Sequence, residues 1–195
     1  MNFGLCKMAT QDKMAVSQQT QDQPEDTVCF AELREGVVVL RINGRGTFSN
    51  SVELKNIADA MNARAFVQHT RFVVDLAKCS TMDSTFMGVL ASIGLRQKKE
   101  LGELMAVVNA NPQSVRLLQT LGLSYFLEVR PAVDLPKVDD SRFHTPEHDQ
   151  VDKVGQIIHM IEAHQCLCDV DSQNEVRFQS VLKYLNDSLK KERGE

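Results

Sequence analysis

The sequence predicts an α/β fold in which a mixed β-sheet carries its helices mainly on one face, followed by a C-terminal pair of helices. Between residues 27 and 129, apolar runs of strand length alternate with longer segments whose apolar residues recur at helical spacing. The first two strand-like runs are joined by a short turn containing Gly36, which predicts a hairpin at the start of the sheet. Two amphipathic segments without strands between them occupy residues 145–195.

Composition divides the chain of 195 residues into four parts. Residues 1–26 are rich in Gln, Thr, Asp and Ser and predict a flexible N-terminal tail. Residues 27–129 form the domain that contains the alternating pattern. Residues 130–144 contain prolines and acidic residues without periodicity and predict a linker. Residues 145–195 are predicted to form a C-terminal helical extension, which must bury its apolar stripes on the domain, on itself or on another chain.

The first half of the domain contains five predicted elements. Residues 28–33 and 37–42 are expected to form the hairpin strands, and residues 49–66 a helix. The apolar run at 72–76 predicts a strand buried on both faces, and a helix from about Thr85 to about Leu101 follows it. Small residues on this helix, among them Gly88, suggest that it packs closely on the sheet.

The second half of the chain alternates in the same way. A strand is expected at 104–108, and a helix should begin at Asn111-Pro112 and end near Gly122. Tyr125-Phe126-Leu127 is expected to form a last short strand. One C-terminal helix should start at Thr145-Pro146, and Ser172-Gln173-Asn174-Glu175 has the pattern of a capping box that opens the other.

Charge and composition exclude several classes of function. The net charge is −4 and the Lys and Arg residues are scattered, so direct binding to nucleic acid is not expected. No apolar run reaches the length of a membrane span, and the first residues lack the pattern of a signal peptide, which together predict a cytoplasmic protein. The five cysteines are odd in number and irregularly spaced, as is typical of reduced thiols.

Asp83-Ser84-Thr85 leads directly into the helix expected from residue 85. One interpretation is that Asp83 or Ser84 caps this helix. Ser84 cannot complete a capping box, because Met87 stands where Glu or Gln would be needed. The other interpretation is that these hydroxyls are the chemical switch of the protein.

Residues 72–123 resemble the centre of a STAS domain, the family of bacterial anti-sigma-factor antagonists and of cytoplasmic regions of sulfate transporters. The shared features are a buried strand near an aspartate, Asp-Ser-Thr-x-Met-Gly opening a helix, an apolar strand, and an Asn-Pro helix that ends in Leu-Gly-Leu. The hairpin from residue 28 extends the resemblance. The absence of a predicted membrane span argues against the transporter branch.

The resemblance implies a function in partner switching, a form of signal transduction that regulates transcription. In antagonists of this family, the serine at the position of Ser84 is phosphorylated by a partner serine kinase that is itself an anti-sigma factor. The unmodified form binds the kinase and frees a sigma factor, and the phosphorylated form is released. Thr85 is the second candidate acceptor. The expected partner-binding face extends from Asp83 to Gly88 with the neighbouring loop at Asn43 to Ser49, and its named members are Asp83, Ser84, Thr85, Phe86, Met87, Gly88, Arg45 and Thr47.

Family members commonly have glycine where Phe86 stands, so a large ring beside the acceptor is expected either to contact the partner or to hinder the kinase. Two alternatives stay open: an unphosphorylated STAS scaffold in a stressosome-like assembly, and a STAS subunit of a lipid-transport complex. A phosphatase and a homo-oligomer formed through the C-terminal helices are further possible partners.

Catalysis and metal binding are not predicted. Gly44-Arg45-Gly46 lacks the spacing and the lysine of a phosphate-binding loop, and Ser84 does not lie in a Gly-x-Ser-x-Gly elbow. We therefore expect a non-enzymatic protein without a cofactor, in which the kinase uses the nucleotide. Two histidines, two cysteines and an aspartate crowd the first C-terminal helix, but a single Cys-x-Cys is weak evidence for a metal, and buried thiols and exposed imidazoles are expected instead. These residues are His159, His164, Cys166, Cys168 and Asp169.

Overall fold

The computed structural model describes residues 25–64, 69–130, 138–146 and 151–194. Its centre is a five-stranded mixed sheet in the order β1-β2-β3-β4-β5, in which β1 is antiparallel to β2 and all the other neighbours are parallel. The strands are β1 (Thr27–Arg34), β2 (Val37–Gly46), β3 (Arg71–Met82), β4 (Met105–Val108) and β5 (Leu127–Arg130). The predicted mixed sheet and its opening hairpin are confirmed.

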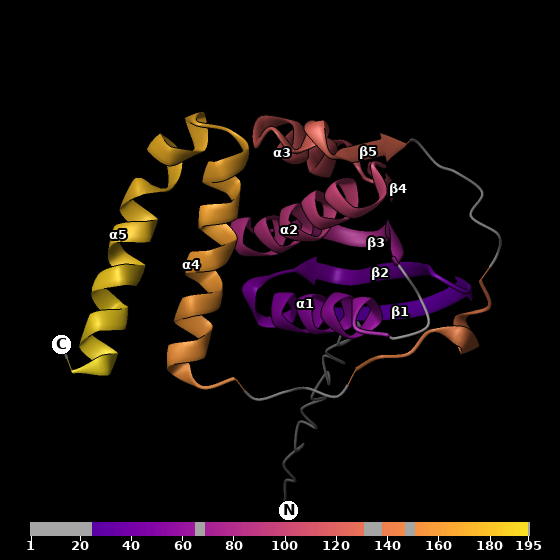
Figure 1. Cartoon of the computed structure of the whole chain (residues 1–195), viewed down its shortest axis with the longest axis horizontal. Helices are drawn as coiled ribbons and strands as arrows, with labels where there is room; N and C mark the ends of the chain where they lie inside the picture. The colour runs from indigo at the N-terminus through magenta and orange to yellow at the C-terminus, as the bar shows by residue number, and fades with distance from the viewer. Residues whose placement is uncertain (1–24, 65–68, 131–137, 147–150, 195) are drawn as a thin grey trace, which may run out of the picture.

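Three helices connect the parallel strands: α1 (Phe48–Asn62), α2 (Ser84–Leu101) and α3 (Pro112–Thr120). Because the strand order advances in one direction and such crossovers are right-handed, all three helices lie on the same face of the sheet. Figure 1 shows α1 and α2 side by side in front of the strands. Helices α4 (Lys153–Val170) and α5 (Gln173–Arg193) form an antiparallel hairpin beside this layer, so the predicted C-terminal helix pair is confirmed.

Strand β3 is much longer than its apolar run. It continues past Leu76 to Met82, pairing with the end of β2, where Gly46 lies opposite Met82. Among the described strands, β4 pairs with β3 only as far as Asp75, so the later residues of β3 have a neighbour on one side and lose the continuous apolar pattern. The extension brings the start of α2 beside the start of α1, and the N–H of Asp83 donates to the carbonyl of Gly46 at 2.9 Å.

Several predicted boundaries are wrong. The last strand starts at Leu127, and Leu123–Tyr125 is a 3-10 turn named η1. Helix α4 begins at Lys153 rather than at Thr145, because Asp152 caps it by accepting from the N–H of Gly155 at 2.8 Å. Ser172 does not form the predicted side-chain cap of α5, since its backbone is already in the helical region. Residues 1–24 of the predicted tail and the end of the helix expected at 49–66 lie outside the described residues, and α1 itself ends at Asn62.

The opposite face of the sheet carries a charged cluster under part of the predicted linker. Nε of Arg41 on β2 lies 3.1 Å from Oδ2 of Asp75 on β3. The ring of Phe143 stacks on the Arg41 guanidinium at 3.8 Å, and Asp140, in the short 3-10 turn η2 (Asp140–Arg142), also contacts Arg41. The backbone of His144 pairs with Phe30 at the free edge of β1. Residues 138–146 are therefore seated against the domain.

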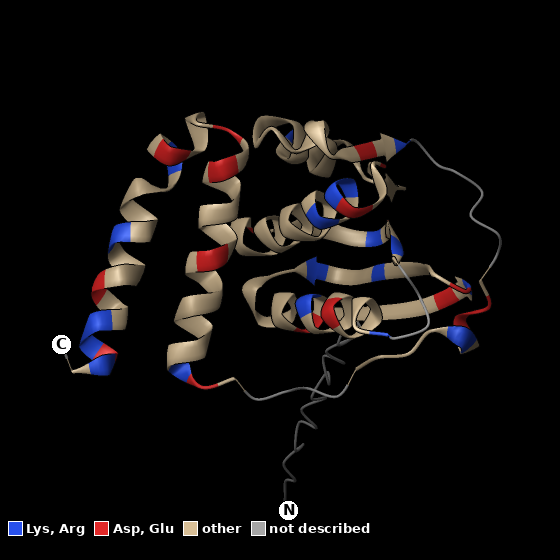
Figure 2. Cartoon of the chain, viewed as in Figure 1, with Lys and Arg blue, Asp and Glu red and all other residues tan. Residues whose placement is uncertain are grey.

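The main core lies between the sheet and α1–α3, and Phe72, Phe86 and Phe126 are among its largest fully buried side chains. Ala163 and Leu167 of α4 join this core. A second, smaller cluster lies between α4 and α5 and consists of Ile157, Ile161 and Leu185. Charged residues of both signs are interspersed along α5 and α1 (Figure 2). None of the helices in the described ranges is both long and apolar enough to span a bilayer.

Candidate functional site

Asp83 joins the N-termini of two helices. As the N-cap of α2, its Oδ1 accepts a hydrogen bond from the N–H of Phe86 at 2.8 Å. Its Oδ2 accepts from the N–H of Phe48, in the first turn of α1, also at 2.8 Å. One carboxylate thus satisfies a backbone donor of each helix, where the positive ends of both dipoles meet. The capping interpretation of the motif holds for Asp83.

The loop between β2 and α1 is held beside this cap. Oδ1 of Asn50 accepts from the N–H of Thr47, and Nδ2 of Asn50 donates to the carbonyl of Arg45 at 2.9 Å. The Arg45 side chain is exposed and pairs with Asp26, whose pKa it lowers mainly through a side-chain hydrogen bond. The structure therefore brings Arg45 and Thr47 to the start of α2, as the predicted face requires.

Ser84 is the first residue of α2 and is half-buried under α4. Its Oγ lies 2.9 Å from Nε2 of His164, whose Nδ1 lies 2.7 Å from the carbonyl oxygen of Met160. A carbonyl only accepts, so Nδ1 carries the proton, and in the neutral ring Nε2 must be an acceptor. The Ser84 hydroxyl therefore donates to His164, and its proton is directed at the C-terminal hairpin.

Gly88 lies one turn further along α2, where the backbones of α2 and α4 almost touch. A Cβ at this position would lie 2.3 Å from the carbonyl oxygen of Ala163. The small residues of α2 thus contact two different neighbours. Gly94 allows the close approach of Phe126 and Leu127 beside the sheet, and Gly88 allows the close approach of α4. The expectation that Gly88 packs on the sheet is wrong for this reason.

The remaining members of the predicted face point inward. Thr85, Phe86 and Met87 are buried, and the Phe86 side chain is 0% exposed. Its ring fills the space above Gly46, where a Cβ would lie 2.7 Å from ring carbon Cδ1. This corrects the expectation that the Phe86 ring contacts the partner or obstructs the kinase, since the missing side chain at Gly46 lets the ring enter the core. With α4 in place, neither Thr85 nor Met87 is presented at the surface.

His159 makes a second polar contact between α4 and the domain. Its Nε2 lies 2.8 Å from Oγ of Ser51 on α1. Because the Ser51 hydroxyl donates to the carbonyl of Phe48, Nε2 is the donor to Ser51. Burial lowers the pKa of His159, and nearby Lys55 lowers it further. Both His159 and His164 are buried, so the prediction of exposed imidazoles is wrong.

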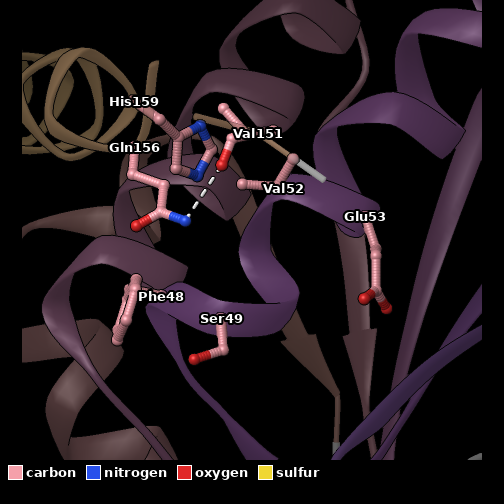
Figure 3. A pocket seen from close by; sticks show the side chains of 7 residues that line it. All are labelled: Phe48, Ser49, Val52, Glu53, Val151, Gln156 and His159. Carbon is pink, nitrogen blue, oxygen red and sulfur yellow. Dashed lines mark hydrogen bonds between the residues drawn. The ribbon is translucent and has the colours of Figure 1, made fainter. Parts of the chain in front are cut away.

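Two cavities lie where α4 meets α1 and α2. One of about 80 Å³ is open beside the α1 start, and Figure 3 shows its lining side chains together with the hydrogen bond from Gln156 to the carbonyl of Val151. The other, of about 170 Å³, includes Gly88 and Ala163 in its lining. His159 lines both. The first is lined by Phe48, Ser49, Val52, Glu53, Val151, Gln156 and His159, and the second by Lys55, Gly88, Val89, Ser92, Arg96, His159, Glu162 and Ala163.

Cys166 and Cys168, both on α4, take no part in the two serine–histidine hydrogen bonds. Burial, followed by the charge of Asp169, raises the pKa of the Cys166 thiol to about 11, and the pKa of Cys168 is also raised. Within the described ranges, no three His, Cys, Asp or Glu side chains are grouped so that they could hold a metal ion. The two histidines contact serines of the domain instead.

A family model described as "Mlab, STAS domain" matches residues 29–128, which is just over half of the chain. The chain therefore belongs to the STAS domain family. No curated protein matches.

Among solved structures, the anti-sigma factor antagonist SpoIIAA in its unphosphorylated form is 15% identical, with a TM-score of 0.45, over 55% of this chain and 90% of that chain. A putative anti-sigma factor antagonist from Thermotoga maritima is 19% identical, with a TM-score of 0.45, over 53% of this chain and 86% of that chain. The Bacillus cell fate determinant SpoIIAA in its phosphorylated form is 16% identical, with a TM-score of 0.43, over 53% of this chain and 90% of that chain.

Proposed function

We propose that this STAS protein is a non-enzymatic binding module of the anti-sigma-factor-antagonist type, controlled by phosphorylation of Ser84. The unmodified chain binds a serine kinase that is itself an anti-sigma factor, and a phosphate on Ser84 ends the binding. The position of Ser84 carries this proposal: it is the first residue of α2, beside a loop and a second helix start that Asp83 holds against it.

The electrostatics of this position fit a phosphorylation switch. A phosphate adds about −1.5 to −2 charges at neutral pH. The start of α2 offers a positive dipole end, so the domain itself is expected to stay folded. A partner surface fitted to a neutral hydroxyl would instead meet a dianion next to the Asp83 carboxylate, and burying that pair of charges is unfavourable.

The direct test is to incubate the full chain with ATP and a native lysate, reisolate it and measure its intact mass. We expect the gain of one phosphate, lost in Ser84→Ala and retained in Ser92→Ala, a serine of the same helix. Thr85→Ala tests the second acceptor. A phosphate that persists in Ser84→Ala, or no phosphate in any chain, would contradict the proposal.

A second candidate is an unphosphorylated assembly subunit, stressosome-like or lipid-transport-complex-like. It is favoured by the position of the Ser84 hydroxyl, which lies beneath α4 and already donates to His164. Val176 and Tyr184 on α5 are 80% and 70% exposed and offer apolar contacts to another subunit. This candidate predicts an oligomer in solution that Val176→Ser with Tyr184→Ser dissociates, whereas Ser84→Ala leaves it intact.

A further inference from the structure

The α4–α5 hairpin covers the face that a partner of Ser84 would need. We propose that this hairpin is an intramolecular cover whose packing on the domain depends on the Ser84 hydroxyl. Phosphorylation of Ser84 then releases the hairpin while the sheet stays folded. The use of this cover in regulation rests on the proposed function. The cover itself rests on contacts between α4 and the domain.

Two serine–histidine hydrogen bonds hold α4 on the domain. Ser84 donates to His164 at 2.9 Å, and Ser51 accepts from His159 at 2.8 Å. Both rings are buried, so each lost bond leaves a polar nitrogen in a site shielded from water. The chemical state of the Ser84 oxygen therefore bears directly on how well α4 fits.

The fit of α4 on α2 leaves no room beside Gly88. Since even a methyl group there would lie 2.3 Å from the carbonyl oxygen of Ala163, the two backbones are in van der Waals contact one turn from Ser84. A kinase or another partner reaches Ser84 and the start of α2 only in those molecules in which α4 has moved away. Hairpin and partner compete for one face.

The hairpin has features of a unit that can move away while keeping its own structure. Ile157, Ile161 and Leu185 form a small core between α4 and α5, apart from the main core. At the hairpin turn, Nδ2 of Asn174 donates to the carbonyl of Leu121, after α3, at 3.0 Å. The cavity beside Phe48 and Val151 lies toward the other end of α4. We expect the hairpin to open at that end, with the turn as its pivot.

Phosphorylation removes the hydrogen bond from Ser84 to His164, which helps to hold the hairpin on the domain. Transfer of the terminal phosphoryl group of ATP forms a bond between Oγ and the γ-phosphorus and breaks the bond from that phosphorus to the β,γ-bridging oxygen, which leaves with ADP. The Oγ–H bond also breaks, and its proton is released. The ester oxygen can no longer donate to Nε2 of His164, whose Nδ1 faces the carbonyl oxygen of Met160. Three phosphate oxygens must also enter a space closed by α4. The modified chain should stay open, which leaves the phosphate accessible to a phosphatase.

Hydrogen exchange on the full chain tests the cover without any kinase. Phosphoserine is incorporated at position 84 during translation, and amide exchange is compared with the unmodified chain and with phosphoserine at position 180, an exposed site on α5. We expect exchange in residues 153–170 to accelerate about tenfold or more with phosphoserine at 84, with β2 and β3 unchanged and the control like the unmodified chain. Gly88→Ala should act in the same direction, although alanine favours a helix more than glycine does.

Exchange in α4 that is unchanged or slower with phosphoserine at position 84 would overturn the proposal, and slower exchange would indicate that the phosphate holds α4 on the domain. Equal acceleration in α4 and β3 would also overturn it, because the domain would then unfold as a whole. A chain that releases its hairpin in this test but never carries phosphate in cells would refute the proposed function and leave the cover standing.

Discussion

At the scale of single residues, Asp83 explains why the motif is placed where it is. Its two carboxylate oxygens each accept from the start of a different helix. Neither serine nor asparagine could do the same, because each has only one oxygen in the position to accept. The residue before Ser84 therefore fixes the relative position of α1 and α2 and gives Ser84 a rigid setting.

Replacing Asp83 tests this double cap. Asp83→Ala should lower the free energy of unfolding by about 2 kcal/mol, since both helix starts lose an acceptor and a single cap contributes ~1 kcal/mol. Asp83→Asn keeps one acceptor and should lose about half as much. Denaturant unfolding measures both, and equal stability of Asp83→Ala and the parent chain would contradict the double cap.

Phe86 shows how this chain accommodates a departure from the family pattern. Its ring lies in the core above Gly46 and is fully buried. Phe86→Ala should therefore destabilise the domain by about 3–5 kcal/mol, and Phe86→Leu by clearly less. The Tm of each variant measures this. A small loss in Phe86→Ala together with weaker partner binding would place the ring on the partner face instead.

The sequence predicted part of the candidate site. Asp83-Ser84-Thr85 was identifiable because a capping motif is local and lies in one stretch of chain. His159 and His164 were not recognised as partners of the serines, because pairs separated by 80 residues or more leave no periodic pattern. With Cys166 and Cys168 they gave only a weak metal-site pattern, which was not predicted to bind a metal, and successive helical residues point in different directions.

At the scale of elements, the interface of α4 contains a titratable ring. His159 lies among charged side chains from three helices: Lys55 and Glu53 of α1, Arg96 of α2 and Glu162 of α4 line the cavities around it. Burial and Lys55 lower its pKa, whereas Glu162 opposes this shift. The neutral ring is the form that the docked hairpin favours.

The stability of the chain should consequently fall on acidification. The unfolded His159 takes up a proton near its ordinary pKa of 6.5, but the folded ring does so only at lower pH. Between these two pKa values the unfolded state binds more protons, so stability rises with pH and is lost as pH falls through this window. The Tm measured from about pH 7.5 to about pH 5.5 should drop more for the parent than for His159→Gln. Parallel profiles would refute this role.

Element boundaries were predicted least well, for identifiable reasons. The extension of β3 beyond Leu76 pairs with β2 on one side, so it lacks the apolar run that marked the strand. The start of α4 was assigned to Thr145-Pro146, but residues 138–146 are held on the sheet through Phe143 and Asp140. A tertiary contact thus outweighed a local helix-start pattern.

At the scale of the whole molecule, the chain combines a STAS domain with an α4–α5 hairpin packed beside its helical layer (Figure 1). The strand alternation was sufficient to predict the sheet and its helices, since hydrophobic periodicity is a property of each segment alone. The surface on which the α4–α5 hairpin packs was not predictable in this way. An amphipathic helix can bury its stripe on a domain or on another chain, and the choice depends on distant residues such as Gly88.

The most direct test of the account compares partner binding by two forms of the full chain. The kinase recovered with unmodified protein is titrated against the unmodified chain and against the chain carrying phosphoserine at position 84. The account predicts that the phosphate weakens binding by about a hundredfold or more. Equal affinity for the two forms would contradict the claim that the chemical state of Ser84 controls this surface.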